Sequence, residues 1–317
     1  MTTLLKKKFL ATSYGKIAYL ETGNESRPPV LFIHGIPTSS YLWRHVMRVL
    51  QGDFHCFAPD LMGLGDTEVD PDRDLFHMNA QAEMLLEFMT ILGHKRFSLV
   101  CHDQGGAAAQ ILMARHGGNL VAAVLTDCVC YDNWPVPLIA RYQKLARLPF
   151  VMDILVRTGI MEGIELRTAF SGFRRGVHQG KRISNESISE YLRPLRQGPS
   201  ERQRFMKFLL AGHPRYTQQI VPGLKEFEEP TLVIWAADDR YISPSWGKKL
   251  FEDIPGAKAF EVVPFCGHFW QEDRPAEFTS LIGDFLKKQY LTADNKTKKK
   301  KSARIRPQKK AGPKNVS

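Results

Sequence analysis

Short runs of apolar residues alternate with amphipathic stretches along the first 130 residues of the chain. The apolar runs predict buried strands, and stretches with an apolar residue every three or four positions predict helices. Strands are expected at residues 30–33, 55–58, 97–101 and 121–125, with helices at 41–50, 80–92 and 107–116. Buried strands separated by helices imply a parallel sheet with right-handed crossovers. Residues 9–13 and 16–21 alternate apolar and polar positions and predict an antiparallel hairpin at the sheet edge.

The alternation of strands and helices stops near Trp134 and returns at Pro230. From there it predicts a strand at 231–235, a helix at 245–254, a strand at 259–263 and a last helix at 275–288. Residues 134–222 have helical periodicity and hold 15 basic and 6 acidic residues. The simplest organisation is a sheet domain formed by 1–133 and 223–291, with 134–222 inserted as a helical domain.

The formal charge of +11 is unevenly distributed along the chain. Residues 292–317 hold ten Lys or Arg and one acid, which leaves 34 basic and 32 acidic residues in 1–291. This near balance argues against a basic domain wrapped around nucleic acid. Because 292–317 has few apolar residues and dense like charge, we expect a disordered, solvated tail, with contact to an anionic partner as the alternative.

Composition favours a globular protein. Hydrophobic residues make up 43% of the chain, and no apolar run approaches the roughly 18 residues that a spanning helix needs. The first residues do not fit a signal peptide, so a cytoplasmic protein is expected. Five cysteines without a CxxC pair indicate neither a disulfide framework nor a zinc site. The oligomeric state stays open.

A tight turn joins the predicted strand 97–101 to the helix that follows it. Its sequence is HDQGG, residues 102–106. A turn of this kind exposes a nucleophile at the carboxyl end of a sheet strand, and its glycines let the helix pack closely beneath it. The nucleophile position is held by Asp103, for which capping of the helix is the alternative role.

A second strand end supplies backbone donors for an oxyanion. The strand 30–33 runs into His34-Gly35-Ile36. In hydrolases built on a parallel sheet, a backbone N–H in this turn and the N–H after the nucleophile together form an oxyanion hole. These donors would be the amides of Ile36 and Gln104.

The last two predicted strands end in a candidate acid and a candidate base. His268 follows Gly267 after the last strand, which suits a general base. Asp239 follows the strand before it and can orient the histidine. The chain order Asp103, Asp239, His268 is nucleophile, acid and base.

Four segments of the chain resemble one family. They are HGIPTSSYLWR (34–44), APDLMGLGDT (58–67), HDQGG (102–106) and GHFWQEDRP (267–275). Together they make the chain similar to the α/β-hydrolases of the branch that holds haloalkane dehalogenases and epoxide hydrolases. The resemblance covers about residues 9–133 and 223–291, and the insertion corresponds to the family's cap domain by position.

The resemblance implies a two-step reaction on a small-molecule substrate. Asp103 would attack a saturated carbon, expel a halide or open an epoxide, and form an alkyl ester. His268, oriented by Asp239, would activate water against this ester, while the amides of Ile36 and Gln104 hold the oxyanion. No metal or organic cofactor is required.

The sequence departs from the dehalogenase pattern at two positions. Haloalkane dehalogenases commonly hold the halide with a Trp after the nucleophile and an Asn after the His-Gly pair. This chain has Gln104 and Ile36 there. Ile36 offers no side-chain N–H, so halide stabilisation would have to come from the cap.

Two other substrate classes stay open from the sequence. Epoxide hydrolases protonate the ring oxygen with cap tyrosines, for which Tyr142, Tyr191 and Tyr216 are candidates by region only. Haloacetate-type substrates would need cationic partners, and Arg174 and Arg175 in the inserted domain are candidates.

Two further alternatives concern the triad acid and catalysis itself. Some dehalogenases place the acid after the sixth strand, where this chain has Asp127. We favour Asp239, since an Asp at the position of Asp127 often has a structural role. A non-catalytic small-molecule-binding protein on the same fold is the hypothesis from a different class.

Overall fold

The centre of the molecule is a twisted sheet. The computed structural model describes residues 5–304, and within them eight strands pair in the order β1-β2-β4-β3-β5-β6-β7-β8. The strands are β1 (Lys8–Ala11), β2 (Lys16–Thr22), β3 (Pro29–Ile33), β4 (His55–Pro59), β5 (Phe97–Asp103), β6 (Leu120–Cys128), β7 (Thr231–Ala236) and β8 (Ala257–Val263). β2 pairs antiparallel with β1 and β4, and all other neighbours are parallel. The predicted parallel sheet with an edge hairpin is confirmed.

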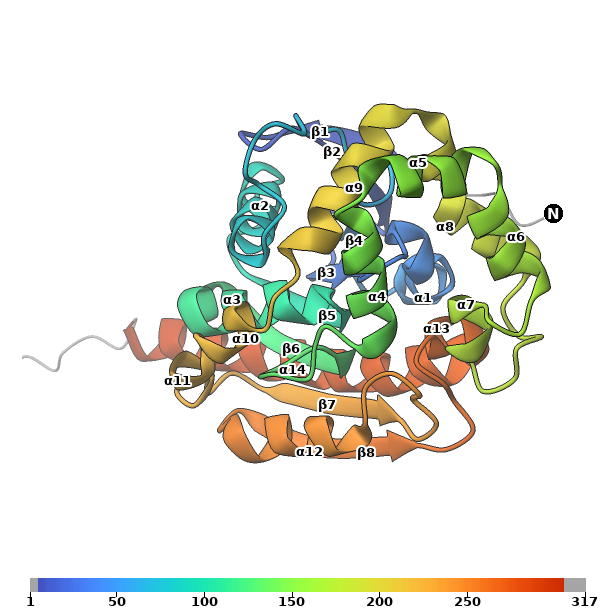
Figure 1. Cartoon of the computed structure of the whole chain (residues 1–317). Helices are drawn as coiled ribbons and strands as arrows, with labels where there is room; N and C mark the ends of the chain where they lie inside the picture. The colour runs from blue at the N-terminus through green and yellow to red at the C-terminus, as the bar shows by residue number, and fades with distance from the viewer. Residues whose placement is uncertain (1–4, 305–317) are drawn as a thin grey trace, which may run out of the picture.

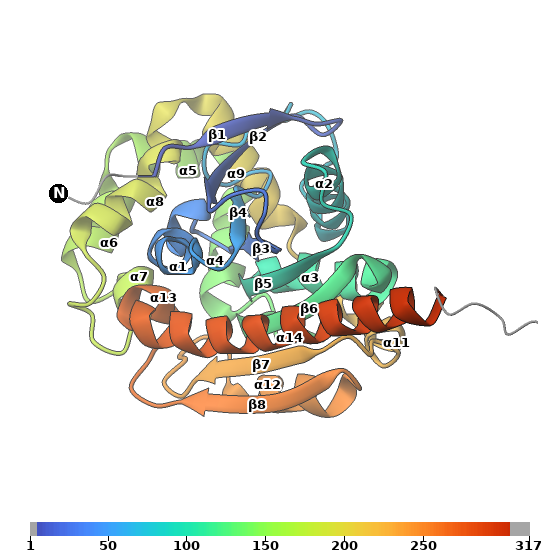
Figure 2. The same ribbon diagram turned by 180° about the vertical axis from the view of Figure 1, so that it is seen from behind.

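Helices cover both faces of this sheet (Figures 1 and 2). One face carries α2 (Met78–Ile91), α3 (Gly105–His116) and α12 (Pro244–Asp253), and the other carries α1 (Arg44–Leu50) and α14 (Pro275–Arg304). The short 3-10 helices η1 (Ser40–Trp43) and η2 (Gly117–Asn119) and the α-helix α13 (Trp270–Asp273) lie in the connections. Because both faces are covered, β4, β5 and β7 are buried at every position, as their continuous apolar sequences predict.

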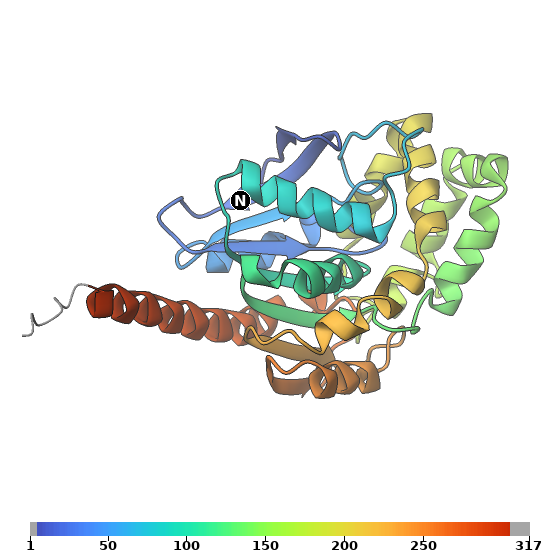
Figure 3. The same cartoon turned by 90° about the vertical axis from the view of Figure 1, so that its left-hand side faces the viewer.

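The chain between β6 and β7 is helical. Its helices are α4 (Pro137–Ala146), α5 (Pro149–Arg157), α6 (Ile160–Arg167), α7 (Gly172–Arg175), α8 (Asn185–Gln197), α9 (Pro199–Ala211), α10 (Arg215–Gln218) and α11 (Val221–Leu224). Helices α4 to α9 pack on one another and form the cap, whereas α10 and α11 pack against α3 of the sheet domain. The cap lies at the end of the molecule opposite the far end of α14 (Figure 3).

The last helix is longer than the sequence pattern predicts. α14 continues to Arg304 and so includes the first part of segment 292–317, which we expected to be disordered throughout. The residues concerned are mostly Lys, Ala, Thr and other types that a helix tolerates. Helix therefore continues there without an apolar stripe. Residues 305–317 lie outside the described residues.

Two features bear on expectations drawn from composition: the apolar length of the helices and the state of the cysteines. Within residues 5–304 no helix is long and apolar enough to cross a membrane. All five cysteines are buried free thiols.

Candidate active site

Asp103 stands at the sharp turn between β5 and α3. Its φ of 52° lies in the left-handed region, which a residue other than glycine rarely adopts. Two glycines make room for the turn. A Cβ on Gly35 would lie 2.2 Å from Asp103 Oδ1, and a Cβ on Gly106 would lie 2.3 Å from the Cβ of Cys128. The strained backbone and close packing hold the Asp103 carboxylate at the carboxyl edge of the sheet.

Backbone N–H groups point at this carboxylate. The amide of Ile36 donates to Asp103 Oδ1 at 2.7 Å, and the amide of Gln104 also donates to the carboxylate. Burial acts to raise the pKa of Asp103, but His268 and these donors outweigh it and hold the pKa below its usual value. Asp103 is therefore ionised near neutral pH.

His268 lies between two carboxylates. Its Nδ1 is 2.9 Å from Asp239 Oδ2 and its Nε2 is 3.5 Å from Asp103 Oδ2. Burial acts to lower the pKa of His268, but Asp239 and Asp103 raise it well above its usual range. The other oxygen of Asp239 accepts from the amides of Tyr241 and Ile242 at 2.8 and 3.0 Å, which fixes its orientation.

Asp127 lies close to this pair without a hydrogen bond to His268 among the described contacts. Its Oδ1 accepts from the Ala236 amide at 2.9 Å and its Oδ2 from the Thr126 hydroxyl at 2.5 Å. Burial and the charge of Asp239 raise the pKa of Asp127 well above its usual value. The geometry thus places Asp239, not Asp127, on the imidazole.

Asp127, Asp239 and His268 form the one cluster of possible metal ligands in the described residues. One ligand atom from each of Asp127, Asp239 and His268 lies within 4.8 Å of the others. The hydrogen bonds above already occupy every carboxylate oxygen with a protein donor. This donor set suits an oriented, proton-carrying imidazole better than a cation.

Two further histidines support the site, and the sequence patterns did not single out their roles. Burial lowers the pKa of His102 to about 3, so the neutral ring donates from Nε2 to the carbonyl of His268 at 2.9 Å. Burial also lowers the pKa of His34 to about 4, and its Nε2 accepts from the Leu61 amide at 3.0 Å. Both rings hold loops of the site by neutral hydrogen bonds.

A cavity between the sheet edge and the cap opens onto Asp103 and His268. Its walls are mostly apolar, and the cap contributes Leu138, Ile139, Met152, Met161, Leu192 and Phe205. Its other polar groups are Tyr142 and Glu165 from the cap and Tyr241 from the loop after β7. No Trp, Asn, Gln, Lys or Arg lines the cavity in the described part of the chain. Such a lining suits an apolar small molecule.

Of the three cap-region tyrosines named from the sequence, one lines the cavity. Tyr142 does so, whereas Tyr191 donates its hydroxyl to Glu272 at 2.5 Å. Tyr216 stacks on His77 and lies in α10, on the sheet-domain side. Tyr191 and Tyr216 do not line this cavity, because helical periodicity does not reveal which face of a helix meets the substrate.

The arginines named for an anionic substrate are also away from the cavity. Arg174 donates to the carbonyls of Gly180 and Leu166 and to the side chain of Asn185. Arg175 is exposed on α7. The pairing with a substrate carboxylate that they suggested finds no support in their positions.

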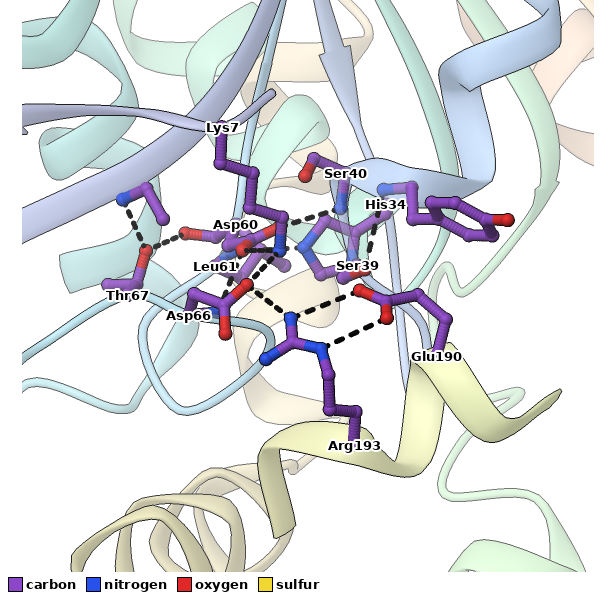
Figure 4. A network of polar contacts seen from close by, with 12 residues as sticks. Lys7, His34, Ser39, Ser40, Asp60, Leu61, Asp66, Thr67, Glu190 and Arg193 are labelled. Carbon is purple, nitrogen blue, oxygen red and sulfur yellow. Dashed lines mark hydrogen bonds and ion pairs between the residues drawn. The ribbon is translucent and has the colours of Figure 1, made fainter. Parts of the chain in front are cut away.

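A charged network lies beside the loop that carries Ile36 (Figure 4). Lys7 Nζ bridges Asp60 Oδ2 at 2.5 Å and Asp66 Oδ2 at 2.6 Å. Asp60 also accepts from the Ser40 amide at 2.7 Å, and Arg193 of α8 pairs with Asp66 at 2.6 Å. The network therefore connects the N-terminal segment, the chain that follows β3 and the cap.

Comparison with known proteins bears on the family. A family model described as alpha/beta hydrolase fold matches residues 28–275. Epoxide hydrolase 3 of Xenopus tropicalis is 24% identical over 288 residues, which cover 87% of this chain and 76% of that protein. Haloalkane dehalogenase 2 of Mycobacterium bovis is 26% identical over 288 residues, which cover 87% of this chain and 93% of that protein.

A third relative has a different activity in its name. The cis-3-alkyl-4-alkyloxetan-2-one decarboxylase of Shewanella oneidensis is 26% identical over 307 residues, which cover 90% of either chain. Three activities at nearly equal identity mean that overall similarity does not choose the substrate. The choice has to come from the residues that line the cavity.

Proposed function

Since the chain belongs to the α/β hydrolase fold family, within the branch of epoxide hydrolases and haloalkane dehalogenases, we propose that Asp103 is its nucleophile and that it acts through a covalent alkyl ester. The substrate is a small apolar molecule whose reacting carbon is saturated. His268 activates the water that releases the product, and Asp239 orients His268.

The observation that carries this proposal is the surroundings of the Asp103 carboxylate. Oδ1 already accepts from the Ile36 amide, and Oδ2 faces His268. Once Oδ2 has attacked carbon, Oδ1 is the carbonyl oxygen of the ester, and water attack turns it into an oxyanion. The donors are thus in place before the charge develops, which is what electrostatic catalysis requires.

Ester formation also prepares His268 for the second step. The uncharged ester removes one of the two carboxylates that raise the pKa of His268. The imidazolium can then lose its proton and accept one from water. Attack at the ester carbon and loss of the alcohol regenerate the Asp103 carboxylate.

The cavity lining favours an oxygen leaving group over a halide. A departing halide is stabilised by polarised N–H groups, and no side chain with one lines the cavity in the described residues apart from His268. Ile36 is apolar. Tyr142 instead brings a hydroxyl group to the cavity, and a hydroxyl can protonate the oxygen of an opening epoxide. Epoxide hydrolysis is therefore the first candidate activity and dehalogenation the second.

An anionic haloacid is a poor fit. Asp103 and Glu165 both bring carboxyl groups to the cavity, and no cationic residue other than His268 lines it in the part of the chain described. A second carboxylate next to an ionised Asp103 would be repelled in these apolar surroundings.

Trapping the ester tests the proposal. In a His268→Gln variant, the first step should proceed and the second should fail, so intact-protein and peptide mass spectrometry should find an adduct on Asp103. An opened epoxide adds its full mass because the ring oxygen stays attached, whereas a haloalkane adds its mass less that of hydrogen halide.

The matched control is His268→Gln combined with Asp103→Asn, which should accumulate no adduct. The panel should hold medium-chain epoxides, haloalkanes and an alkyl β-lactone. Absence of an Asp103 adduct across that panel would reject the covalent mechanism and favour a non-catalytic binding protein.

A further inference from the structure

One buried carboxyl group of the cavity takes no part in the steps above. Glu165 lies on α6 and is 6% exposed, and it lines the same cavity as Asp103 and His268. Burying a carboxyl group in apolar surroundings is costly unless it is hydrogen-bonded or neutral. The hydrogen bonds of Glu165 therefore bear on whether its carboxyl group carries a proton.

The two oxygens of Glu165 have different surroundings. Oε2 accepts from the Ser171 hydroxyl at 2.9 Å and from the Phe173 amide at 3.3 Å. Ser171 Oγ itself accepts from the Arg174 amide, so its one proton goes to Glu165. Oε1 lies on the side of Gly172, and the Tyr142 hydroxyl interacts with the carboxyl group. Oε2 is thus held by Ser171 and Phe173, whereas Gly172 and the Tyr142 hydroxyl complete the hydrogen bonds of the carboxyl group.

The groups that face Glu165 are phenols rather than cations. Tyr142 comes from α4 and Tyr241 from the loop after β7, where its hydroxyl donates to the Gly172 carbonyl at 2.5 Å. The charge of Arg175, on α7, acts to lower the pKa of Tyr241, but burial raises that pKa above its usual value. Burial raises the pKa of Glu165, and the hydrogen bonds from Ser171, Phe173, Gly172 and Tyr142 only partly offset this. Glu165 therefore holds its proton at a higher pH than an exposed Glu.

We propose that Glu165 is the proton source for the leaving oxygen and acts through the Tyr142 hydroxyl, which assigns the cavity to epoxides with apolar substituents. This inference rests on the proposed function. Tyr142 touches the substrate oxygen, and Glu165 acts through it.

The electrons and protons balance over one turnover. An Asp103 oxygen forms a bond to the ring carbon, and the pair of the breaking C–O bond goes to the ring oxygen. This oxygen takes the Tyr142 proton, and Tyr142 takes the Glu165 proton. His268 then gives a proton to solvent and accepts one from the water whose oxygen bonds to the Asp103 carboxyl carbon. As the bond from that carbon to the ester oxygen breaks, the departing alkoxide takes the proton from His268, His268 takes the remaining proton from the Asp103 carboxyl group, and Glu165 regains one from solvent. The sum is epoxide plus water to diol.

A halide leaving group needs no proton, and this difference gives the test. The rate of Asp103 ester formation is measured by rapid quench and mass spectrometry in the His268→Gln background, with 1,2-epoxyoctane and with 1-bromooctane. Adding Glu165→Gln should slow the epoxide reaction by about 100-fold, the lower end for a lost general acid. It should leave the bromide reaction within about threefold, since no proton is transferred in it.

The pH profile separates proton supply from simple positioning. With Glu165 present, epoxide ring opening should slow as the pH rises through the raised pKa of Glu165, and with Glu165→Gln it should be slow and flat. Gln keeps an acceptor for Ser171 and Phe173, so the backbone of α7 should stay anchored. Tyr142→Phe should reproduce the loss with the epoxide.

The matched control is Glu162→Gln on the same helix, whose carboxylate pairs with Arg196 and does not line the cavity. It should leave both rates unchanged. Equal slowing of both substrates by Glu165→Gln, or no slowing of either, would overturn the role of Glu165 while leaving the Asp103 ester intact. No ester from either substrate with Glu165 present would overturn the proposed function and this inference with it.

Discussion

His268 has its pKa set by two carboxylates, of which one changes charge during the proposed reaction. Asp239 keeps its hydrogen bond to Nδ1, while Asp103 is an anion before alkylation and a neutral ester afterwards. An opposite charge a few ångströms away raises a histidine pKa by about one to three pH units. The first step thereby lowers the pKa of His268 and produces the neutral imidazole that acts as the base in the second step.

Replacing Asp103 with Asn should lower the pKa of His268. The substitution removes the charge 3.5 Å from Nε2 and keeps the size of the side chain. We expect a fall of about one to three pH units, followed by NMR titration of the His268 ring protons. The folded-state pKa should stay above that of a free histidine, because Asp239 remains at 2.9 Å.

Asp238→Asn is the control for this titration. Asp238 is next to Asp239 in the chain, but its carboxylate pairs with His178. Its removal should leave the titration of His268 unchanged. An unchanged His268 pKa in Asp103→Asn would mean that Asp103 does not govern the protonation of the base.

Among single residues, the sequence predicts site residues that stand at strand ends. It misses cavity residues whose position depends on the rotation of a helix. Asp103, Asp239 and His268 follow strands, so a parallel sheet brings them to one edge, as the structure has them. Glu165 and Tyr241 carry no motif. Their places in the cavity depend on how α6 and the loop after β7 pack, which local periodicity does not contain.

Helix α8 of the cap is attached to the sheet domain by charged side chains at two places. Arg193 pairs with Asp66 (Figure 4), and Tyr191 donates to Glu272, which also forms two hydrogen bonds with Arg44. Burial alone would raise the pKa of Asp66, but Arg193 and Lys7 lower it to about 2. Arg193 and Lys7 thus stabilise the ionised form of Asp66 over its neutral form.

Asp66 should therefore contribute to stability in a defined pH range. A carboxyl group whose pKa is lower in the folded state stabilises the fold above its unfolded value, and loses that contribution as the pH falls towards the folded value. For Asp66 this range runs from 3.8 down to about 2. Asp66→Asn should reduce the free energy of unfolding at pH 7 by about 2 kcal/mol, and the difference should shrink through that range.

Urea unfolding at several pH values measures this difference. Asp72→Asn is the control in the same loop region, since Asp72 is 84% exposed and lies 3.8 Å from Lys207. It should change stability little, because exposed ion pairs contribute about 0 to 1 kcal/mol. An Asp66→Asn effect that is small, or that persists unchanged at pH 2, would exclude the proposed coupling.

The sequence also predicts most elements of the fold, but not their limits where packing decides them. The buried strands are predicted because a strand that is covered on both faces is apolar at successive positions. The limits of the inserted domain differ, because α10 and α11 pack on α3 although their residues continue the helical pattern of the cap. α14 extends beyond the predicted limit into residues whose types a helix tolerates.

The formal charge separates along the whole molecule. The insertion carries an excess of nine positive charges and segment 292–317 another nine, so the remainder is acidic by about seven. Figure 3 shows the cap and the far end of α14 at opposite ends of the molecule. Positive charge is therefore split between two distant regions rather than gathered into one surface, and only the C-terminal region can be removed without disturbing the cavity.

Truncation after Leu291 should separate the C-terminal charge from the fold and the chemistry. The residues of α14 that pack inward, Phe278, Ile282 and Leu286, lie before this point, and Leu291 is 68% exposed. Thermal unfolding and the rate of ester formation should match the full chain. Binding to heparin, which is steeply salt-dependent when many cations contribute, should be lost, because residues 1–291 are nearly balanced in charge.

Truncation after Gln289 is the contrasting variant, because it also removes Tyr290. The hydroxyl of Tyr290 accepts from the Ser98 amide at 3.0 Å and donates to the Pro29 carbonyl at 2.5 Å, which ties α14 to the starts of β5 and β3. Leaving these buried groups without a partner should cost about 2 kcal/mol and lower the unfolding temperature. If the truncation after Leu291 is equally destabilised, the helix beyond it contributes to the fold. If the chain truncated after Leu291 still binds heparin tightly, the polyanion site lies on the cap. The charge of segment 292–317 is then not what attracts a polyanion.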